Sequence, residues 1–492
     1  MQAELSSDTN RYARGSMVLT LATAWEYLLR FGQKIVLARL LMPEHFGLLG
    51  AILASVLAVE ALADVGLRQS VIQNHHGARR DYLNAVWWVS LTRGLFLFVV
   101  SFLLAPLVAA YFRQPEATQL FRLGFAGILI SSVISPRVYV LEKSFKFGAW
   151  AMVMQGGVLA STVTSLVLAW IMRDASALVI AHVIEIATRV ALSFVVAPFR
   201  PAYPRIDGSL SEVLRFARGM FGVPVLTVLF MQLDLLFLGR MVPLSLLGCY
   251  VLARSLSDML LFTTRKVVIP VFLPGLSAIK DDPERLARHF QQGLQAMAMI
   301  VLPLMVFMAI EAEVLLGMVY GPSYQVAATA FVILCFHAFT QSCAGMFRTL
   351  FLALGRPDVF RRAMLVEAAA GALMIYPGIK WFGLAGASMA LLGAGLVFLM
   401  YQFNLAAPLV ELTKRDFILS MQPGAMLALV YVVAPWMLIR FTDPNDIVML
   451  TMLAISTAAA LVHAVNKLCR QHEVNLLAAV RSLHLSVERV ST

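Results

Sequence analysis

Long apolar runs recur along the whole chain, and they constrain its fold more than any other feature. Each run is about 20 residues long, which is the length that an α-helix needs to cross the hydrocarbon core of a bilayer. The composition agrees, because 60% of the 492 residues are hydrophobic and only 14% are charged. Runs such as 292–310 lack the two-residue alternation of a membrane β-barrel. The sequence therefore predicts an all-α polytopic membrane protein with about 14 transmembrane helices. The predicted spans are 16–37, 44–66, 83–110, 117–136, 149–172, 176–198, 219–239, 244–264, 292–319, 325–347, 363–379, 382–407, 418–439 and 446–466.

The basic residues are distributed as expected for membrane topology and not as in a nucleic-acid-binding patch. The net charge is +11, but the 39 Lys and Arg residues recur in short clusters between apolar runs. Most of them fall in alternate segments that lie on the same side as the N-terminus when about 14 spans are counted. Because basic loops stay in the cytoplasm, both termini are predicted to be cytoplasmic. The opposite loops are short and carry few basic residues: Arg39, Arg113, Arg173, Arg240, Lys380 and Arg440.

Two pairs of similar segments indicate an internal duplication. "LARLLMPEHFGLL" (37–49) and "LGRMVPLSLLGCY" (238–250) share an Arg, a Pro and a Gly in the same order, and the Arg and the Gly have the same spacing at an offset of 201 residues. "LEKSFKF" (141–147) and "LGRPDVF" (354–360) follow at an offset of 213 residues. An even number of spans in each half gives both halves the same orientation, as in transporters with parallel repeats. We expect a six-helix bundle in 1–200, a second in 201–410, and helices 13 and 14 with a cytoplasmic tail in 411–492.

Charged residues lie deep inside several predicted spans. Glu26 is about ten residues into the first span, so it is about 15 Å from the membrane surface at 1.5 Å per residue. Charges at such depth are costly and normally face a protein interior or a water-filled cavity. Since Arg matches phosphate oxygens in pairs, the intramembrane cations predict a cationic central cavity that binds an anionic substrate. The candidate substrate-binding residues are Arg30, Lys34, Arg93, Arg189 and Arg254. The candidates for ion coupling or for pairing are Glu26, Glu60, Asp64, Glu185, Asp234 and Asp258.

A purely structural interpretation of these charges stays open. Glu26 and Arg30, Glu185 and Arg189, and Arg254 and Asp258 are each four residues apart, so each pair is able to neutralise itself on one helix face. Three further acids are either carriers of a proton or sodium ion or buried polar contacts between helices. These are Glu60, Asp64 and Asp234.

The sequence contains no motif for catalysis or for nucleotide hydrolysis. It has no GxxxxGK[ST] phosphate-binding loop, no HExxH and no GxSxG. The loops are too short to hold a folded catalytic domain. We therefore expect a protein that is not an enzyme and that has no cofactor and no metal site.

Several stretches resemble the polysaccharide transporter family, the Wzx-type flippases. They fall between about residues 36 and 390, which is most of the chain. They identify the family but say little about the substrate. The matching stretches are "VLARLLMPEHFGLLGAI" (36–52), "LADVGLRQSVIQ" (62–73), "VFLPGLSAIKDDPERLARHF" (271–290), "VYGPSYQVAATAFVIL" (319–334) and "ALGRPDVFRRAML" (353–365). The resemblance implies the fold of a superfamily that includes multidrug extruders and the lipid II flippase. Glu26, Arg30 and Lys34 are not positions that the resemblance assigns.

The resemblance also implies a function and a location. It predicts translocation of undecaprenyl-diphosphate-linked oligosaccharides across the bacterial inner membrane, for exopolysaccharide, capsule or O-antigen (lipopolysaccharide) assembly. A polysaccharide polymerase and a chain-length regulator are the expected protein partners, and no nucleic acid is expected. Alternating access around the cationic cavity is the expected mechanism. Two other functions stay open: a multidrug or cation antiporter of the same superfamily, and a membrane-embedded glycosyltransferase or polymerase.

Overall fold

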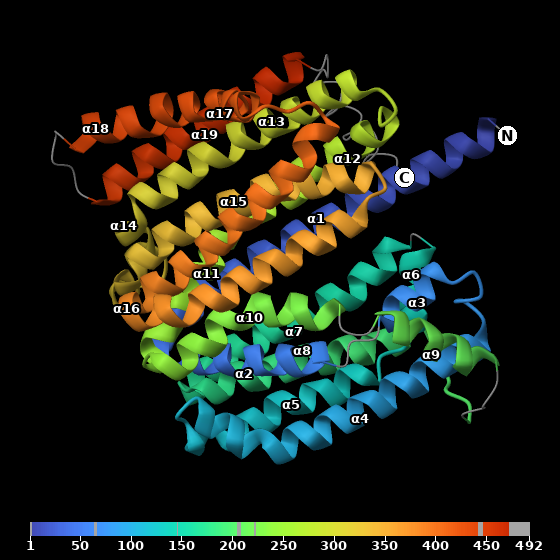
Figure 1. The fold of residues 1–492 in the computed structure, drawn as a ribbon. Helices are drawn as coiled ribbons and strands as arrows, with labels where there is room; N and C mark the ends of the chain where they lie inside the picture. The colour runs from blue at the N-terminus through green and yellow to red at the C-terminus, as the bar shows by residue number, and fades with distance from the viewer. Residues whose placement is uncertain are drawn as a thin grey trace, which may run out of the picture. The chain divides into compact units, whose positions relative to one another are not determined.

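The protein is helical throughout the part that its computed structural model describes, which comprises residues 2–62, 66–144, 146–203, 208–220, 223–440 and 446–471 (Figure 1). Within these ranges there is no strand. In this described part of the chain, ten helices are long and apolar enough to cross a membrane, or up to 11 if one bent pair counts as a span. The predicted all-α polytopic fold is confirmed. The number of about 14 spans stays a prediction, and the predicted tail after residue 471 lies outside the described residues.

The described chain divides into two compact units. Unit 1 comprises Met1–Leu252, Val319–Tyr324 and Ile375–Leu384, and unit 2 comprises Ala253–Met318, Gln325–Met374 and Ala385–Thr492. The helix α11 contributes to both units because its residues span the boundary at Leu252. The domain limits predicted from the sequence stay predictions.

Unit 1 is built on a group of long helices that pack side by side. α7 packs against α8 and α1, α5 packs against α4 and α8, and α2 packs against α10 (Figure 1). Short helices α3 and α6 contact each other at one end of this group. The elements are α1 (Gln2–Leu40), α2 (Pro43–Leu62), α3 (Leu67–Gln73), α4 (Arg80–Tyr111), η1 (Pro115–Ala117), α5 (Thr118–Ser132), α6 (Arg137–Lys143), α7 (Phe147–Met172), α8 (Ala175–Val196), α9 (Gly208–Met220), α10 (Val223–Met241) and the start of α11 (Leu244–Thr263).

The helix ends in unit 1 follow from local sequence chemistry. α2 begins at Pro43, a residue that suits the first helical position, and Glu44 complements the positive end of the helix dipole. α8 begins after Asp174, whose carboxylate accepts a hydrogen bond from the backbone N–H of Ser176 at 2.9 Å. Gly66 precedes α3 in the left-handed conformation, at φ 67°, which costs a glycine little.

The two segments "LARLLMPEHFGLL" and "LGRMVPLSLLGCY" contact each other within unit 1, and the contact is reciprocal. A Cβ atom on Gly47 would collide with the backbone carbonyl of Leu244, and one on Gly248 would collide with that of Pro43. Both pairs are related by the same offset of 201 residues that relates the sequences. Equivalent residues that meet in this way are typical of an internal two-fold relation, so the contact supports the predicted duplication.

Unit 2 centres on α13, which packs against α15, α17 and α19 (Figure 1). α16 contains 50 residues, about 75 Å of helix, and the bilayer core needs only about 30 Å. Gly383, at φ 55° and ψ −127°, breaks α16 into two helical halves, so each half has the length of a span. The elements after α11 are η2 (Thr264–Val268), α12 (Ile269–Ala278), α13 (Pro283–Ile310), α14 (Ala312–Val319), η3 (Pro322–Ala327), α15 (Ala328–Ala353), α16 (Pro357–Ala406), η4 (Ala407–Leu409), α17 (Lys414–Ala428), η5 (Leu429–Val433), α18 (Ala434–Arg440) and α19 (Asp446–Gln471).

Candidate functional site

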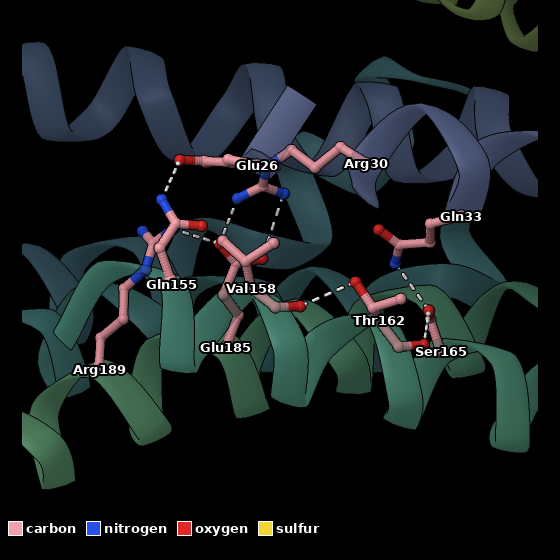
Figure 2. A network of polar contacts seen from close by, with 9 residues as sticks. All are labelled: Glu26, Arg30, Gln33, Gln155, Val158, Thr162, Ser165, Glu185 and Arg189. Carbon is pink, nitrogen blue, oxygen red and sulfur yellow. Dashed lines mark hydrogen bonds and ion pairs between the residues drawn. The ribbon is translucent and has the colours of Figure 1, made fainter. Parts of the chain in front are cut away.

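A charged network lies inside unit 1, and Glu185 is at its centre. One oxygen of Glu185, Oε1, accepts hydrogen bonds from Nη2 of Arg30 and from Nη2 of Arg189, each at 2.6 Å. Arg30 also pairs with Glu26, with Nε 3.0 Å from Oε1. Gln155 donates from Nε2 to the other oxygen of Glu26 at 3.2 Å, so the network extends over α1, α7 and α8 (Figure 2).

The helices hold these groups by spacing and by close approach. Glu26 and Arg30 are one turn apart on α1, and Glu185 and Arg189 are one turn apart on α8, so each pair shares a helix face. α7 packs against both helices. At Gly157 of α7, a Cβ atom would lie 3.0 Å from Nε of Arg189 and 2.8 Å from the Glu185 carbonyl oxygen. The absence of a side chain at this position therefore leaves the space through which Arg189 passes.

The network is close to electroneutral, because two arginines face two carboxylates. Only 7% of the Glu185 side chain is exposed, and a carboxylate that is so well buried needs compensating cations. Both pairs that the sequence predicts as local alternatives, Glu26 with Arg30 and Glu185 with Arg189, are present. The link from Arg30 to Glu185, which joins residues 155 positions apart, was not predicted from the sequence.

A cavity of about 560 Å³ lies beside this network within unit 1. α2, α4, α5 and α8 contribute most of its wall. Its ionisable lining residues are Glu60, Arg68, Arg93, His182 and Arg189. Three guanidinium groups and one carboxyl group belong to the lining, and the volume is in the range of sites for small ligands. Arginine binds phosphate oxygens with paired N–H groups, so the cavity has the chemistry of an anion site.

Arg189 connects the charged network to the cavity. Its Nη2 binds Glu185, while its buried Nε has no hydrogen-bond partner among the described residues. The side chain also lines the cavity. Arg189 is therefore held by a carboxylate on one side and keeps a donor for another group.

Arg68 at one end of the cavity is fixed by a second ion pair. Its Nη2 and Nε bind the two oxygens of Glu142 at 2.6 and 2.9 Å, which joins α3 to α6. These hydrogen bonds, together with the charge of Glu142, raise the pKa of Arg68 above its usual value despite partial burial. The sequence did not single out Arg68. The signal available was its place two residues after Gly66 in the family-like stretch 62–73.

The remaining predicted residues are spread over the molecule. Lys34 lies on α1, one turn after Arg30, and is half-buried. Arg254 and Asp258 lie one turn apart on the part of α11 that belongs to unit 2. Both have interaction partners. Asp64 lies outside the described residues.

Glu60 and Asp234 make polar contacts between helices. The hydroxyl of Tyr250 donates to Asp234 at 2.8 Å, and both residues are fully buried. Ser131 on α5 approaches Glu60 on α2 at 3.5 Å, which is a weak contact. For Asp234 these contacts favour the structural alternative. Glu60 also lines the cavity.

Among the described residues, no group of three or more His, Cys, Asp or Glu side chains is arranged to hold a metal ion. The site of unit 1 is thus a set of arginines, carboxylates and amides from α1, α2, α3, α4, α7 and α8. Such a set is able to bind and orient an anion through charge-assisted hydrogen bonds.

Comparison with known proteins identifies the family. Residues 36–329 match the family described as "Polysaccharide biosynthesis protein". The chain belongs to this family. The match covers more than half of the chain and includes the cavity residues of α2, α4 and α8.

The names of two relatives of this polysaccharide biosynthesis protein also refer to biosynthesis, and one of them refers to transport. The chain is 23% identical to the lipopolysaccharide biosynthesis protein WzxC of Escherichia coli (strain K12), over 79% of this chain and 80% of that protein. It is 24% identical to the succinoglycan biosynthesis transport protein ExoT of Rhizobium meliloti (strain 1021), over 61% of this chain and 60% of that protein.

Solved structures share the fold of this family member. The lipid II flippase MurJ in an inward closed conformation matches 92% of this chain and 99% of its own, with a TM-score of 0.74 at 13% identity. An inward-facing multidrug resistance transporter of the MATE family in the MOP superfamily matches 78% and 94%, with a TM-score of 0.62 at 14% identity. At these identities the matches show the fold, which is the one that the sequence resemblance implied.

Proposed function

We propose that the chain is a flippase that moves undecaprenyl-diphosphate-linked oligosaccharide repeat units across the bacterial inner membrane, for exopolysaccharide, capsule or O-antigen assembly. Membership of the polysaccharide biosynthesis family supports the biosynthetic role. The names of WzxC and ExoT and the MurJ-like fold support translocation of a lipid-linked sugar. The protein acts by transport and carries out no chemical step on the sugar.

The observation that carries the proposal is the arginine-lined cavity of unit 1. Its three guanidinium groups come from α3, α4 and α8, so they line one space from three different helices. A diphosphate offers several oxygen acceptors, and each Arg binds two of them in parallel. In the proposed cycle the diphosphate accepts a hydrogen bond from the unused Nε of Arg189, while Glu185 keeps that side chain in place.

Arg30 has a different role in this proposal from the one expected at first. Its guanidinium group is engaged by both Glu26 and Glu185, so it stabilises the carboxylate that holds Arg189. We propose that Arg93 and Arg189 contact the diphosphate and that Arg30 positions Arg189. Lys34 and Arg254 stay candidates for contacts with other parts of the substrate.

The membrane location and topology follow from the same function. In the proposed function, sugars are attached to the polyprenyl-diphosphate carrier on the cytoplasmic face of the inner membrane. The flippase therefore belongs in that membrane. The distribution of Lys and Arg supports cytoplasmic termini. A polysaccharide polymerase and a chain-length regulator are the proposed partners, because the flipped repeat unit is the material that they would extend.

The test uses cells in which the tested variant is the only form of this transporter that is produced. Arg93→Gln together with Arg189→Gln removes two cavity cations and leaves shorter, uncharged polar side chains in their place. We expect exported polymer to fall at least about tenfold while lipid-linked repeat units accumulate on the cytoplasmic side. The matched control is Arg362→Gln, which removes a cation from a surface pair with Asp358 outside the cavity. We expect no change in the control.

Two results would reject the proposal. Normal polymer export by the double variant, at wild-type protein level, would show that the cavity does not bind the substrate. A change in drug susceptibility with unchanged export would instead favour a multidrug antiporter of the same superfamily.

A further inference from the structure

A buried carboxyl group in unit 2 belongs to a polar cluster that the proposed substrate site does not use. Glu367 lies in the first half of α16 and is 6% exposed. Its Oε1 accepts a hydrogen bond from Nε2 of Gln341 on α15. Ala363, one turn before Glu367 on α16, belongs to an apolar core cluster with Ala344 and Phe398. The carboxyl therefore sits at the edge of a water-poor interior.

Among the described residues, Glu367 is not ion-paired with a cation. Within the described part of the chain its carboxyl has one hydrogen-bond partner, the neutral amide of Gln341, and it takes part in no ion pair. Burial of an ionised carboxylate is costly when neither a cation nor several N–H donors surround it. The closed packing seen here therefore suits the protonated form of Glu367. The single hydrogen bond from the neutral amide of Gln341 favours the carboxylate only weakly and does not replace a cation.

The second half of α16 encloses the cluster at Gly395. A Cβ atom on Gly395 would lie 3.2 Å from Nδ1 of His337 and 3.6 Å from Nε2 of Gln341. His337 and Gln341 are one turn apart on α15, so they share a face of that helix. Nδ1 of His337 is buried and has no hydrogen-bond partner among the described residues. The glycine thus brings helix backbone close to two polar side chains, and one ring nitrogen of His337 is left without a partner among the described residues.

A further polar group continues the cluster toward the end of α16. Gln402 is fully buried, and neither Oε1 nor Nε2 of its amide has a hydrogen-bond partner among the described residues. It lies seven residues after Gly395, which is two helical turns and about 10 Å along the same face. Unpartnered buried amides are rare in folded proteins, and a site that takes up water is one reason for them. Gln402 provides polar groups between the cluster and the end of the helix.

Among the described residues, His337 and Arg348 on α15 and Arg254 and Asp258 on α11 are the ionisable groups to consider around Glu367. Arg348 lies two turns after Gln341 and is stacked over the ring of Phe360 on α16, at 5.1 Å from its centroid. His337 faces the cluster from α15, and Arg254 on α11 interacts electrostatically with His337. Asp258 lies one turn from Arg254 on the same helix. The second half of α16 contributes Gly395 and Gln402, which do not titrate. Glu367 is therefore the acid of the cluster, and its only hydrogen-bond partner among the described residues is an uncharged group.

We propose that Glu367 is the proton-binding site that couples a transmembrane proton gradient to transport. This inference rests on the proposed transport function. The carboxylate takes up one proton when water reaches it from one side of the membrane, and the resulting carboxylic acid is stable in the closed packing. When the helices of unit 2 separate, water from the other side accepts the proton and the carboxylate forms again. Each cycle moves one proton and leaves Glu367 unchanged.

The first test measures the proton itself and needs no substrate. The full-length protein in lipid vesicles is titrated while its infrared difference spectrum is recorded. A protonated carboxyl gives a C=O band that disappears on ionisation. We expect one such band to be missing in Glu367→Gln and to be unchanged in Glu142→Gln, whose carboxylate is already ion-paired with Arg68. Identical carboxyl bands in wild type and Glu367→Gln would overturn the proposal.

The second test measures coupling in vesicles that contain the lipid-linked oligosaccharide. A pH gradient across the membrane is expected to accelerate wild-type translocation at least about tenfold. Glu367→Gln, which resembles the protonated form permanently, is expected to lose this acceleration. Glu367→Asp is expected to keep part of it, since the carboxyl group is retained.

The outcomes separate this inference from the proposed function. Equal acceleration by the pH gradient in wild type and Glu367→Gln would overturn the role of Glu367. Acceleration by a sodium gradient alone would also overturn it. If the wild type moves no lipid-linked oligosaccharide under any gradient, the proposed function fails, and the infrared band still decides whether Glu367 binds a proton.

Discussion

Each of the two units contains a buried glutamate on one of its helices, and the two glutamates have different hydrogen-bond partners. Glu185 in unit 1 and Glu367 in unit 2 are 5% and 6% exposed. Glu185 is shared by two arginines, whereas Glu367 meets a neutral amide. The comparison teaches that burial alone does not define the role of an intramembrane acid. The charge opposite to it decides whether the acid is a fixed part of a network or a group that exchanges a proton.

In both units a glycine leaves space for a polar side chain on a neighbouring helix. Gly157 on α7 lies against Arg189, and Gly395 on α16 lies against His337 and Gln341. In each unit a helix without a side chain at one position approaches a polar cluster on its neighbour. The architecture is thus similar, while the electrostatics differ.

The largest expected difference is in stability. Glu185→Gln leaves Arg30 and Arg189 close together without the shared carboxylate. Loss of one member of a buried ion pair costs about 3–5 kcal/mol, and we expect the lower end because the Arg30 side chain is 35% exposed. Glu367→Gln should change stability by less than about 1 kcal/mol, since the new amide oxygen still accepts from Gln341. Thermal unfolding of the purified proteins in the same detergent measures both.

The same unfolding experiment tests whether Glu185 and Glu367 really differ in this way. If Glu367→Gln destabilises as much as Glu185→Gln, then Glu367 is ionised in the folded protein. The distinction between the two units would then be wrong. Glu142→Gln at an exposed end of unit 1 provides a charge-matched reference for the removal of one carboxylate.

A smaller effect is expected from filling the space at Gly157. In Gly157→Val the added atoms meet Arg189 and the backbone of Glu185, so the arginine has to move. Overpacking of this kind costs about 1–3 kcal/mol. We expect polymer export to fall while most of the protein still reaches the membrane, as measured by export assay and immunoblot. Gly148→Val on the same helix is the control, because no heavy atom lies within 4 Å of a Cβ there. Equal effects of the two changes would remove the argument that Gly157 positions Arg189.

The smallest effect is expected at the ion pair of Arg68 and Glu142. About half of the Arg68 side chain is exposed, and exposed ion pairs contribute about 0–1 kcal/mol. Glu142→Gln should therefore lower stability only slightly. Because Glu142 raises the pKa of Arg68, the stabilising effect of this arginine is complete below its unfolded-state pKa and is lost only at still higher pH. The contribution of Arg68 should accordingly be constant from pH 6 to 9, and a change in melting temperature that depends on Arg68 in this range would contradict the assignment.

Part of the candidate site was predictable because helix geometry is local. Residues four apart share a face, so the pairs Glu26 with Arg30 and Glu185 with Arg189 follow from the spacing alone. The same reasoning cannot find the bond between Arg30 and Glu185, since it depends on how α1 and α8 are rotated about their axes. Gln155 and Gly157 were missed for the same reason. Both lie in a predicted span that is apolar nearly all round and so has no single face that indicates its neighbours.

The sequence by itself determined that the chain is a polytopic helical membrane protein, which family it resembles, and that two segments 201 residues apart are related. These properties depend on the length of apolar runs, on charge distribution and on local motifs, which are written along the chain. Only the tertiary structure decided which intramembrane charges neutralise each other, that Gly47 and Gly248 meet reciprocally, and that Glu367 has an uncharged partner. Those facts depend on the depth and rotation of each helix, and the packing of a whole unit sets both.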